Sequence, residues 1–344
     1  MTDTRARTAK GWLFAGGGIA LLGAGFAMSA RAAFGGLVAT WLFVTGAALG
    51  SLIVLAASEI AEGRWADRLV PACSAGIRLL PWSFGGLVVL VAASARWAPW
   101  PESAPADHRW WLNVPFFAVR SLLGAAVLFG LARAYARRRL EGTPAKRIAI
   151  AFCLSFVIVL TLWALDFVLA MDPTWSDALI GAFYFMSSFL GGAAIASLAA
   201  SVRPEDGDLR HDIGKLLFGL AVFWAYLGWA QFLTIWYGNL PDETEFLVVR
   251  HAAVWQTLGL VCVALIFVGP FTGLMRESAK RNPKLLRVGA SAVLLGLWLS
   301  FQWLVVPSLS SSPSAASVLA GLGALGILLA PLPGDALVSS PAAG

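Results

Sequence analysis

Long apolar stretches constrain this chain more than any other feature. Runs of about 20 residues with almost no charge recur along its 344 residues, and a helix of that length crosses the hydrocarbon core of a bilayer. The runs do not alternate as the strands of a membrane barrel do. Only 13% of the residues are charged, against about 25% in soluble domains. The chain is therefore predicted to be an all-α, multi-pass membrane protein with a single integral membrane domain over residues 1–344.

We expect ten spans. They cover residues 11–29, 33–58, 79–96, 111–133, 148–170, 178–200, 213–237, 249–273, 286–306 and 314–331. The last span is the weakest, because it is short and rich in Gly and Ala. The tail at 332–344 is expected to be flexible.

The distribution of Lys and Arg predicts the orientation, because cytoplasmic loops carry an excess of them. The N-terminus and every second loop carry 19, the other loops carry 4, and Arg120 and Lys215 remain inside spans. Both termini are therefore expected in the cytoplasm, with the strongest anchor at 133–147. The net charge of +6 reflects these loops and does not indicate a nucleic-acid partner.

The stretch at 163–190 organises the rest of the chain. It closes the fifth span, passes an acidic turn with Asp172, Pro173, Trp175 and Asp177, and opens the sixth span. Two spans joined this closely form an antiparallel pair. Asp166 lies inside the first of them, where a bare carboxylate is costly. It is either a proton acceptor at the mouth of an outer half-channel or a carboxylate that pairs two helices, with Arg120 as the candidate partner.

Arg120 is the second polar group at depth. It lies about 13 Å along the fourth span from Trp111, at 1.5 Å per residue, which is too deep for easy snorkelling. It must therefore meet a carboxylate, backbone carbonyls, water or a lipid head group. Arg120 is therefore either part of a proton path or one half of a buried ion pair that fixes helix register, and both interpretations remain open.

A third polar group opens the seventh span. His211, Asp212 and Lys215 lie at its cytoplasmic start, with Asp212 and Lys215 on one helix face. Tyr226 follows three turns later on the face of Lys215, and Gln231 extends the polar character. The group indicates either an inner proton path or an ordinary helix start, with Asp212 near the N-cap and Lys215 snorkelling.

Small residues predict close helix packing. Gly46 and Gly50 are four residues apart in the second span, and Ser188 and Gly192 in the sixth, a spacing that lets helix backbones approach. Packing within the chain is favoured over a subunit interface, since ten spans need many such contacts. An aromatic belt is predicted from tryptophans at the span ends. These are Trp97, Trp100, Trp110, Trp111, Trp175 and Trp236.

The outer start of the eighth span carries Glu243, Glu245, Arg250 and His251. These side chains either gather protons, dock a partner or simply form a solvated helix start, and the last is favoured.

No redox cofactor of the chain's own is expected. Its three histidines fall in loops or at span ends, whereas a haem between membrane helices needs them inside spans. Its three cysteines are isolated, without a metal-ligand spacing. Electron transfer would therefore rely on another subunit or on a diffusing quinone.

Four blocks between Trp111 and Trp255 resemble a known family. W-A-L-D-F-V-L-A-M-D-P-T-W-S-D at 163–177 is similar to the D-W-x-M-S-L-x-P-x-W motif of one membrane subunit of alternative complex III. This complex is a bacterial quinol:cytochrome c or quinol:oxidase oxidoreductase. Blocks at 111–120, 211–218 and 223–244 resemble the neighbouring blocks of that subunit in the same order. The chain resembles the NrfD/polysulfide-reductase-like membrane family, and departs from it in a short N-terminus and a weak tenth span.

The resemblance implies a fold of ten helices, built as two four-helix bundles and an extra pair. It implies a bacterial inner-membrane subunit without a redox group, which supports the complex and conducts protons, with menaquinol or ubiquinol bound in the complex. The implied partners are a second NrfD-like subunit, an iron–sulfur protein, multihaem and monohaem cytochromes c, and lipids. The proton-path candidates that match the family pattern are Asp166, Arg120, His211, Asp212, Lys215, Tyr226 and Gln231.

Two other functions remain open. One is a quinol-binding catalytic subunit of the same complex, with Asp166 or His251 as the base. The other is a stand-alone ten-helix secondary transporter, although the sequence shows no obvious discontinuous helices in matched halves.

Overall fold

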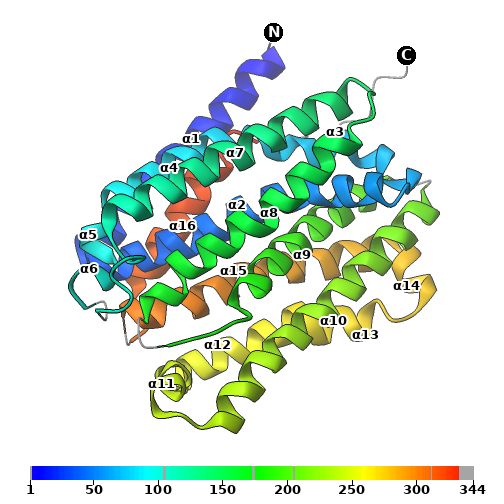
Figure 1. Ribbon diagram of the computed structural model, residues 1–344. Helices are drawn as coiled ribbons and strands as arrows, with labels where there is room; N and C mark the ends of the chain where they lie inside the picture. The colour runs from blue at the N-terminus through cyan, green and yellow to red at the C-terminus, as the bar shows by residue number, and fades with distance from the viewer. Residues whose placement is uncertain (1, 104–105, 173–174, 204–205, 311, 333–344) are drawn as a thin grey trace.

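The computed structural model describes residues 2–103, 106–172, 175–203, 206–310 and 312–332 (Figure 1). The long helices are α1 (Thr2–Met28), α2 (Ala30–Ile60), α4 (Leu80–Ala92), α7 (Val114–Leu140), α8 (Lys146–Phe167), α9 (Ile180–Ser201), α10 (Gly207–Gly238), α12 (Ala253–Val263), α15 (Pro283–Leu309) and α16 (Ala315–Leu329). The short ones are η1 (Arg64–Leu69), α3 (Val70–Ser74), η2 (Ala75–Arg78), α5 (Ser94–Trp97), α6 (Trp100–Ser103), η3 (Leu169–Met171), α11 (Pro241–Arg250), η4 (Ala264–Val268), α13 (Gly269–Gly273) and α14 (Glu277–Arg281). Nine helical segments in this part are long and apolar enough to cross a membrane. The chain is a multi-pass helical membrane protein.

The tenth expected span is a shorter element. α16 has 15 residues, or about 22 Å at 1.5 Å per residue, against a hydrocarbon core of about 30 Å. The prediction of ten full spans is therefore corrected to nine and one short apolar helix, among the described residues. The tail predicted to be flexible falls almost wholly at 333–344, outside the described residues.

Two spans are interrupted by proline. The third runs over Trp65–Ala92 and is divided into η1, α3, η2 and α4, where Pro71 and Pro81 sit at the starts of α3 and α4. Proline has no N–H to donate, so each starts a new helical segment. The eighth span passes from α12 through the π-helical turn η4 into α13, which begins around Pro270. The sequence had predicted these spans at 79–96 and 249–273, so the third begins earlier than predicted, at Trp65, and the break in the eighth was not predicted.

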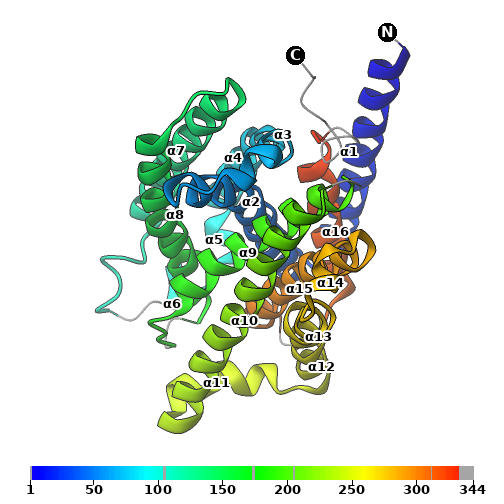
Figure 2. The ribbon, with the colours of Figure 1, turned by 90° about the vertical axis from the view of Figure 1, so that its right-hand side faces the viewer.

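The helices form two groups of four and an outer pair. α2, α4, α7 and α8 pack together, and α9, α10, α15 and the α12–α13 segment form the second group. α2 and α9 meet at the centre, while α1 and α16 lie side by side against α2 (Figure 2). The start of α1 and the end of α16 lie at one end of the molecule. We call this the inner end, following the orientation expected from the Lys and Arg count, and the opposite end the outer end.

The central contact is made by small residues. A Cβ added at Gly50 would overlap the carbonyl oxygen of Ser188, and one added at Gly192 would overlap the backbone of Gly50. The small residues of the second and sixth spans therefore face each other within the chain, which is the interpretation that the sequence favoured. Missing side chains at this crossing let the two backbones touch.

α1 and α16 also approach each other closely at glycines. This contact was not predicted from the sequence. Gly11, Gly18 and Gly25 recur every seven residues in α1. A Cβ at Gly18 would meet Gly323, and one at Gly25 would meet Ala316 and Ala320. A seven-residue repeat of small residues keeps one helix face against its partner.

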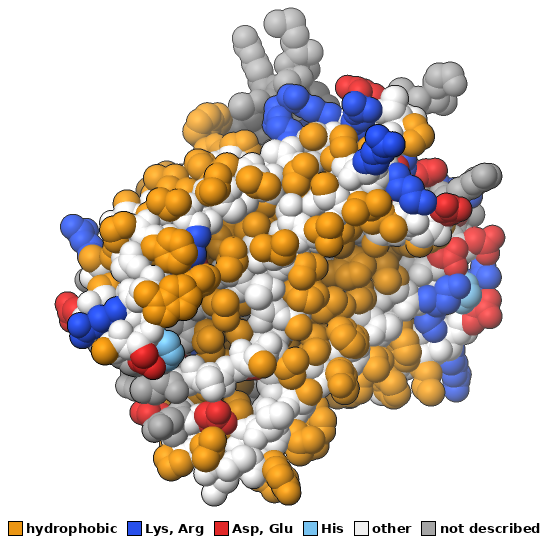
Figure 3. Space-filling model, viewed as in Figure 1, with side chains coloured by type: hydrophobic (Ala, Val, Ile, Leu, Met, Phe, Trp, Pro, Cys, Tyr) orange, Lys and Arg blue, Asp and Glu red, His pale blue; other side chains and the backbone are white. Residues whose placement is uncertain are grey.

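The surface fits a membrane environment. Figure 3 shows hydrophobic side chains over most of the face in view, with charged side chains gathered towards the ends of the helices. The aromatic belt predicted for the outer end is only partly present. Trp110 and Trp236 are exposed, but Trp97, Trp100 and Trp175 are core residues. Trp97 stacks on Phe167 and donates its indole N–H to the Leu90 carbonyl at 2.9 Å. Trp100 packs edge-on against Phe117 of α7 and Trp175 stacks on Phe246 of α11, so contacts with neighbouring helices bury these rings.

Candidate functional site

The stretch at 163–190 joins the two helix groups at the outer end. α8 ends at Phe167, the single turn η3 follows, and α9 begins at Ile180. The two spans are neighbours, but the link between them is longer than the tight turn predicted from the sequence. Pro173, part of that predicted turn, lies outside the described residues. Asp166 and Asp172 stand on either side of η3, and each faces a buried arginine.

The first arginine is Arg120, and it forms a bidentate pair with Asp166. Arg120 Nη2 donates to Asp166 Oδ1 at 2.5 Å, and Nε donates to Oδ2 at 2.9 Å. The Arg120 side chain is 7% exposed and the Asp166 side chain is fully buried. Parallel donors that match a carboxylate are the strongest form of this contact. Of the two interpretations of Asp166, helix pairing with Arg120 is therefore the one that is directly visible.

Local sequence explains how Arg120 reaches its partner. Asn113 caps α7 by accepting the N–H of Phe116 at 2.9 Å, and Pro115 fixes the first turn. The Arg120 side chain points back along α7, so that its Nη1 donates to the Trp111 carbonyl at 2.8 Å. Its guanidinium also lies 4.3 Å from the Trp111 ring centroid. The arginine thus meets both a carboxylate and a backbone carbonyl, two of the options that the sequence had left open.

The second arginine is Arg250, which the sequence placed in a solvated helix start. That prediction is wrong for this residue, since Arg250 is 3% exposed. Its Nη2 donates to the Leu304 carbonyl at 2.7 Å and to Ser308 Oγ at 2.9 Å. Ser308 in turn donates to Asp172 Oδ2 at 2.7 Å, and Arg250 Nη1 lies 3.9 Å from the same oxygen. The neighbouring Glu245 and His251 are exposed, as a solvated start requires.

A proline explains why Arg250 is buried. Pro307 lies inside α15 and cannot donate to the carbonyl four residues earlier, that of Trp303. Arg250 Nε donates to that Trp303 carbonyl at 3.2 Å. A buried backbone carbonyl without a donor is costly, so the arginine compensates for the helix defect. In the sequence Pro307 stands directly after the ninth expected span, 286–306, and only the structure shows that α15 continues past it and pairs the freed carbonyl with Arg250.

The inner polar group lies on α10, away from these arginines. α10 begins at Gly207, capped by Asp206, whose Oδ1 accepts the Leu209 N–H at 3.3 Å. The predicted start at Asp212 was therefore more than one turn late. Lys215 Nζ contacts Asp212 Oδ1 at 2.9 Å, as their spacing predicted. His211 Nδ1 lies 3.9 Å from the same carboxylate oxygen.

Tyr226 and Gln231 continue along α10 without reaching the outer pair. Tyr226 is 61% exposed and, with Lys215, lies on the face of α10 turned away from the other helices. The amide nitrogen of Gln231 is buried without a hydrogen-bond partner. No interaction among the described residues connects this group to Arg120 and Asp166. Arg120 and Asp166 therefore form one cluster and His211, Asp212 and Lys215 a second, and Tyr226 and Gln231 belong to neither.

The outer loop before α9 is fastened to α11. The Trp175 ring stacks on Phe246 with centroids 3.7 Å apart, and Ser176 donates to Glu243 at 3.1 Å. The next residue in the chain is Asp177, whose Oδ1 accepts the Leu179 N–H at 2.7 Å while Oδ2 has no partner. Burial raises the pKa of Asp177 above its ordinary value, and the nearby Glu243 raises it further.

The polar contacts described at the outer end are charge pairs and hydrogen bonds. No group of three or more His, Cys, Asp or Glu side chains that could hold a metal ion occurs in them. No protein-family model matches the chain, and no curated protein matches its sequence.

Proposed function

We propose that this chain is a membrane subunit, without a redox group of its own, of a quinol-oxidising respiratory complex of the alternative complex III type. The observation that carries the proposal is the stretch at 163–190. Its sequence carries the family resemblance, and its two aspartates, Asp166 and Asp172, each engage a buried arginine, one on α7 of the first group and one on α11, which packs on α15 of the second. A stretch built this way ties the two groups together at the outer end. The packing of the helices as two groups of four with an outer pair is also what the resemblance implies.

Proton conduction through half-channels is the second part of the proposal. The outer candidates are Asp166 and Arg120, which sit in the membrane as a closed pair. The inner candidates are His211, Asp212 and Lys215, followed by Tyr226 and Gln231. Asp166 is 1% exposed, so it exchanges a proton only when its pair with Arg120 opens. This proposal therefore places the slow step of outer proton transfer in the separation of that pair.

The outward face of α10 supports a multisubunit setting. Tyr226 and Trp229, near the middle of this span, are 61% and 59% exposed. Neither their hydroxyl nor their indole N–H has a partner within the described residues. Lipid tails offer no acceptor, and an unsatisfied polar group there is costly. A helix of another subunit would supply the missing partner and would enclose the line from Lys215 to Tyr226.

The structure gives less support to a stand-alone transporter than to a subunit of a complex. Alternating-access transporters place broken helices at matched positions of their repeats. Here the broken third span is the second helix of its group, whereas the eighth span, with its π turn, is the third helix of its group. The catalytic alternative needs Asp166 or His251 as a base beside a quinone pocket. Neither residue lines the two apolar grooves that flank α16.

Co-purification tests the proposal. The tagged chain, solubilised from its native membrane in mild detergent, is expected to bring with it haem c absorbance, an iron–sulfur protein and quinol-oxidising activity. A monodisperse single chain with none of these would refute the proposed function. Asp166→Asn then tests the proton role within the assembled complex. Unchanged turnover together with an unchanged proton-to-electron ratio would remove Asp166 from the proton path.

A further inference from the structure

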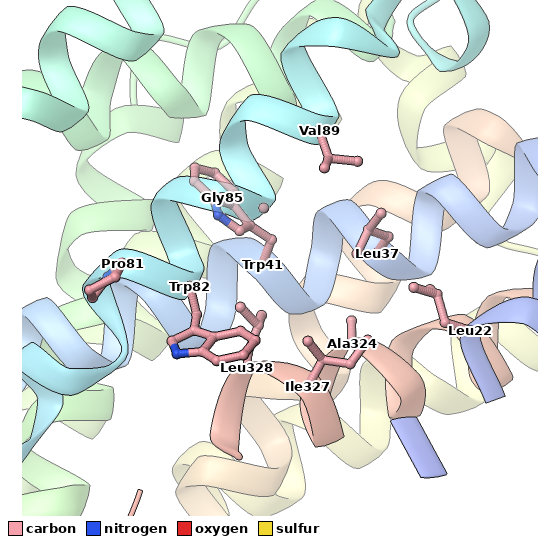
Figure 4. A pocket seen from close by; sticks show the side chains of 11 residues that line it. Leu22, Leu37, Trp41, Pro81, Trp82, Gly85, Val89, Ala324, Ile327 and Leu328 are labelled. Carbon is pink, nitrogen blue, oxygen red and sulfur yellow. The ribbon is translucent and has the colours of Figure 1, made fainter. Parts of the chain in front are cut away.

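Two apolar grooves lie on either side of α16 at its contact with the broken third span. The first has a volume of about 470 Å³ and runs between α4 and the α1–α16 pair, with Trp41 of α2 at its floor and Trp82 at its rim (Figure 4). The second has about 460 Å³ and lies between α16, α15 and the α3–η2 turn. Both fall within the roughly 300–1,000 Å³ range of small-molecule sites, and both have almost wholly apolar walls.

The grooves exist because the third span is broken. A continuous helix would pack along its neighbours, but the chain turns through η2 before α4 begins. Leu79 packs on Leu328 in a small cluster at this point. Leu79 lines the second groove and Leu328 the first, so this contact is the ridge that separates them.

An exposed cation, Arg78, is next to the ridge residue Leu79 in the chain. Arg78 lies in sequence between Gly76 and Leu79, which line the second groove, and Pro81, which lines the first. It is exposed and has no hydrogen bond or ion pair within the described part of the chain. It belongs to the inner end, where anionic lipid head groups are recognised by basic side chains between helices. An arginine beside the hydrocarbon region requires water or an anion.

We propose that this place binds one anionic diacyl phospholipid, with its phosphate on Arg78 and one acyl chain in each groove. The two apolar grooves match two chains, and the charge of Arg78, the residue next to Leu79 of the ridge, matches the head group. Arginine binds phosphate through paired N–H donors. The site is independent of the proposed respiratory function, and it would anchor the α1–α16 pair to the rest of the molecule through lipid.

Gly85 allows a test that leaves the helices intact. It lines the first groove, and a Cβ added there meets nothing within 4 Å. Gly85→Leu therefore fills the groove without a backbone clash. Gly130 of α7 has equally open space and lines neither groove, so Gly130→Leu is the matched control. Arg78→Gln removes only the charge.

The measurement is native mass spectrometry of the purified, delipidated full chain titrated with dioleoyl phosphatidylglycerol or dioleoyl phosphatidylcholine. We expect one tight phosphatidylglycerol per chain, bound about fivefold more tightly than phosphatidylcholine, since a single basic residue contributes about that factor at a membrane surface. Arg78→Gln is expected to abolish this preference, and Gly85→Leu to weaken both lipids at least tenfold. Gly130→Leu is expected to bind as the unmodified chain does.

Two results would overturn the proposal. One is equal affinity of the unmodified chain for the two lipids, which would mean that Arg78 does not recognise the phosphate. The other is unchanged lipid binding by Gly85→Leu with the protein folded, which would mean that the groove holds no acyl chain. Retention of α-helical circular dichroism by each variant shows that it is folded.

Discussion

Removing Asp166 should destabilise the protein strongly, and removing its partner at the same time should restore most of the loss. In Asp166→Leu the Arg120 guanidinium, only 7% exposed, keeps its contact with the Trp111 carbonyl but loses both carboxylate oxygens. A buried charge left without its partner costs about 3–5 kcal/mol. The double variant Arg120→Leu/Asp166→Leu removes both charges, and apolar replacement of a buried pair is often neutral. Its remaining cost is about 1 kcal/mol, for the Trp111 carbonyl left without a donor.

Thermal unfolding in detergent, followed by tryptophan fluorescence, measures the difference. At about 2 °C per kcal/mol for a large chain, Asp166→Leu should lower the midpoint by about 6–10 °C and the double variant by about 2 °C. Glu62→Gln is the control, because Glu62 pairs with Lys146 on the surface, where both side chains are at least half exposed. It should leave the midpoint unchanged. A double variant no more stable than Asp166→Leu would refute the reasoning, since the cost would then not come from the unpaired charge.

Three further predictions concern the packing and the outer end. Gly192→Ala should push α2 from α9 and lower the unfolding midpoint, because its Cβ overlaps Gly50. Gly219→Ala, on an open face of α10, should not lower the midpoint. Equal midpoints for the two variants would contradict the close approach of α2 and α9. Arg250→Leu should leave the carbonyl freed by Pro307 unpaired, costing about 1–3 kcal/mol, and should speed hydrogen exchange in α11; protection equal to that of the unmodified chain would contradict the role of this arginine. Asp177 has a raised pKa in the folded protein, so the folded state holds this proton more tightly than the unfolded state. Stability should therefore fall as pH rises from the ordinary carboxyl pKa to the raised one, and Asp177→Asn should remove that fall in midpoint-against-pH scans.

Much of the candidate site was readable from the sequence because membrane burial makes polar residues conspicuous. Asp166 and Arg120 stood out as charges inside apolar spans, and each had few physically allowed partners. Their pairing was among the interpretations considered, but their separation in sequence gives no geometry. Arg250 was missed for the opposite reason. It lies beside Glu243, Glu245 and His251, so its composition is that of an exposed helix start, and only the approach of α15 buries it.

The tryptophans also show that the sequence of one segment does not tell whether another element will bury it. Trp97 and Trp110 both stand at span ends, where an aromatic ring at the interface is the usual outcome. Which of them is covered depends on whether another helix packs against it. Trp97 is covered because its ring stacks on Phe167 of α8 and its N–H reaches the Leu90 carbonyl of α4, whereas Trp110 is 71% exposed.

The sequence by itself determined that the chain is a helical multi-pass membrane protein, because span length and charge depletion are local properties that a bilayer enforces on each segment separately. It also favoured packing of the small residues of the second and sixth spans within the chain, and the structure showed that these two spans face each other. Only the tertiary structure decided that Asp172 belongs to Arg250, that α16 is too short to span the bilayer alone, and that the broken third span leaves two grooves beside Arg78. These features depend on which helices become neighbours, and that choice is made by the packing of the whole set of side chains rather than by any one segment.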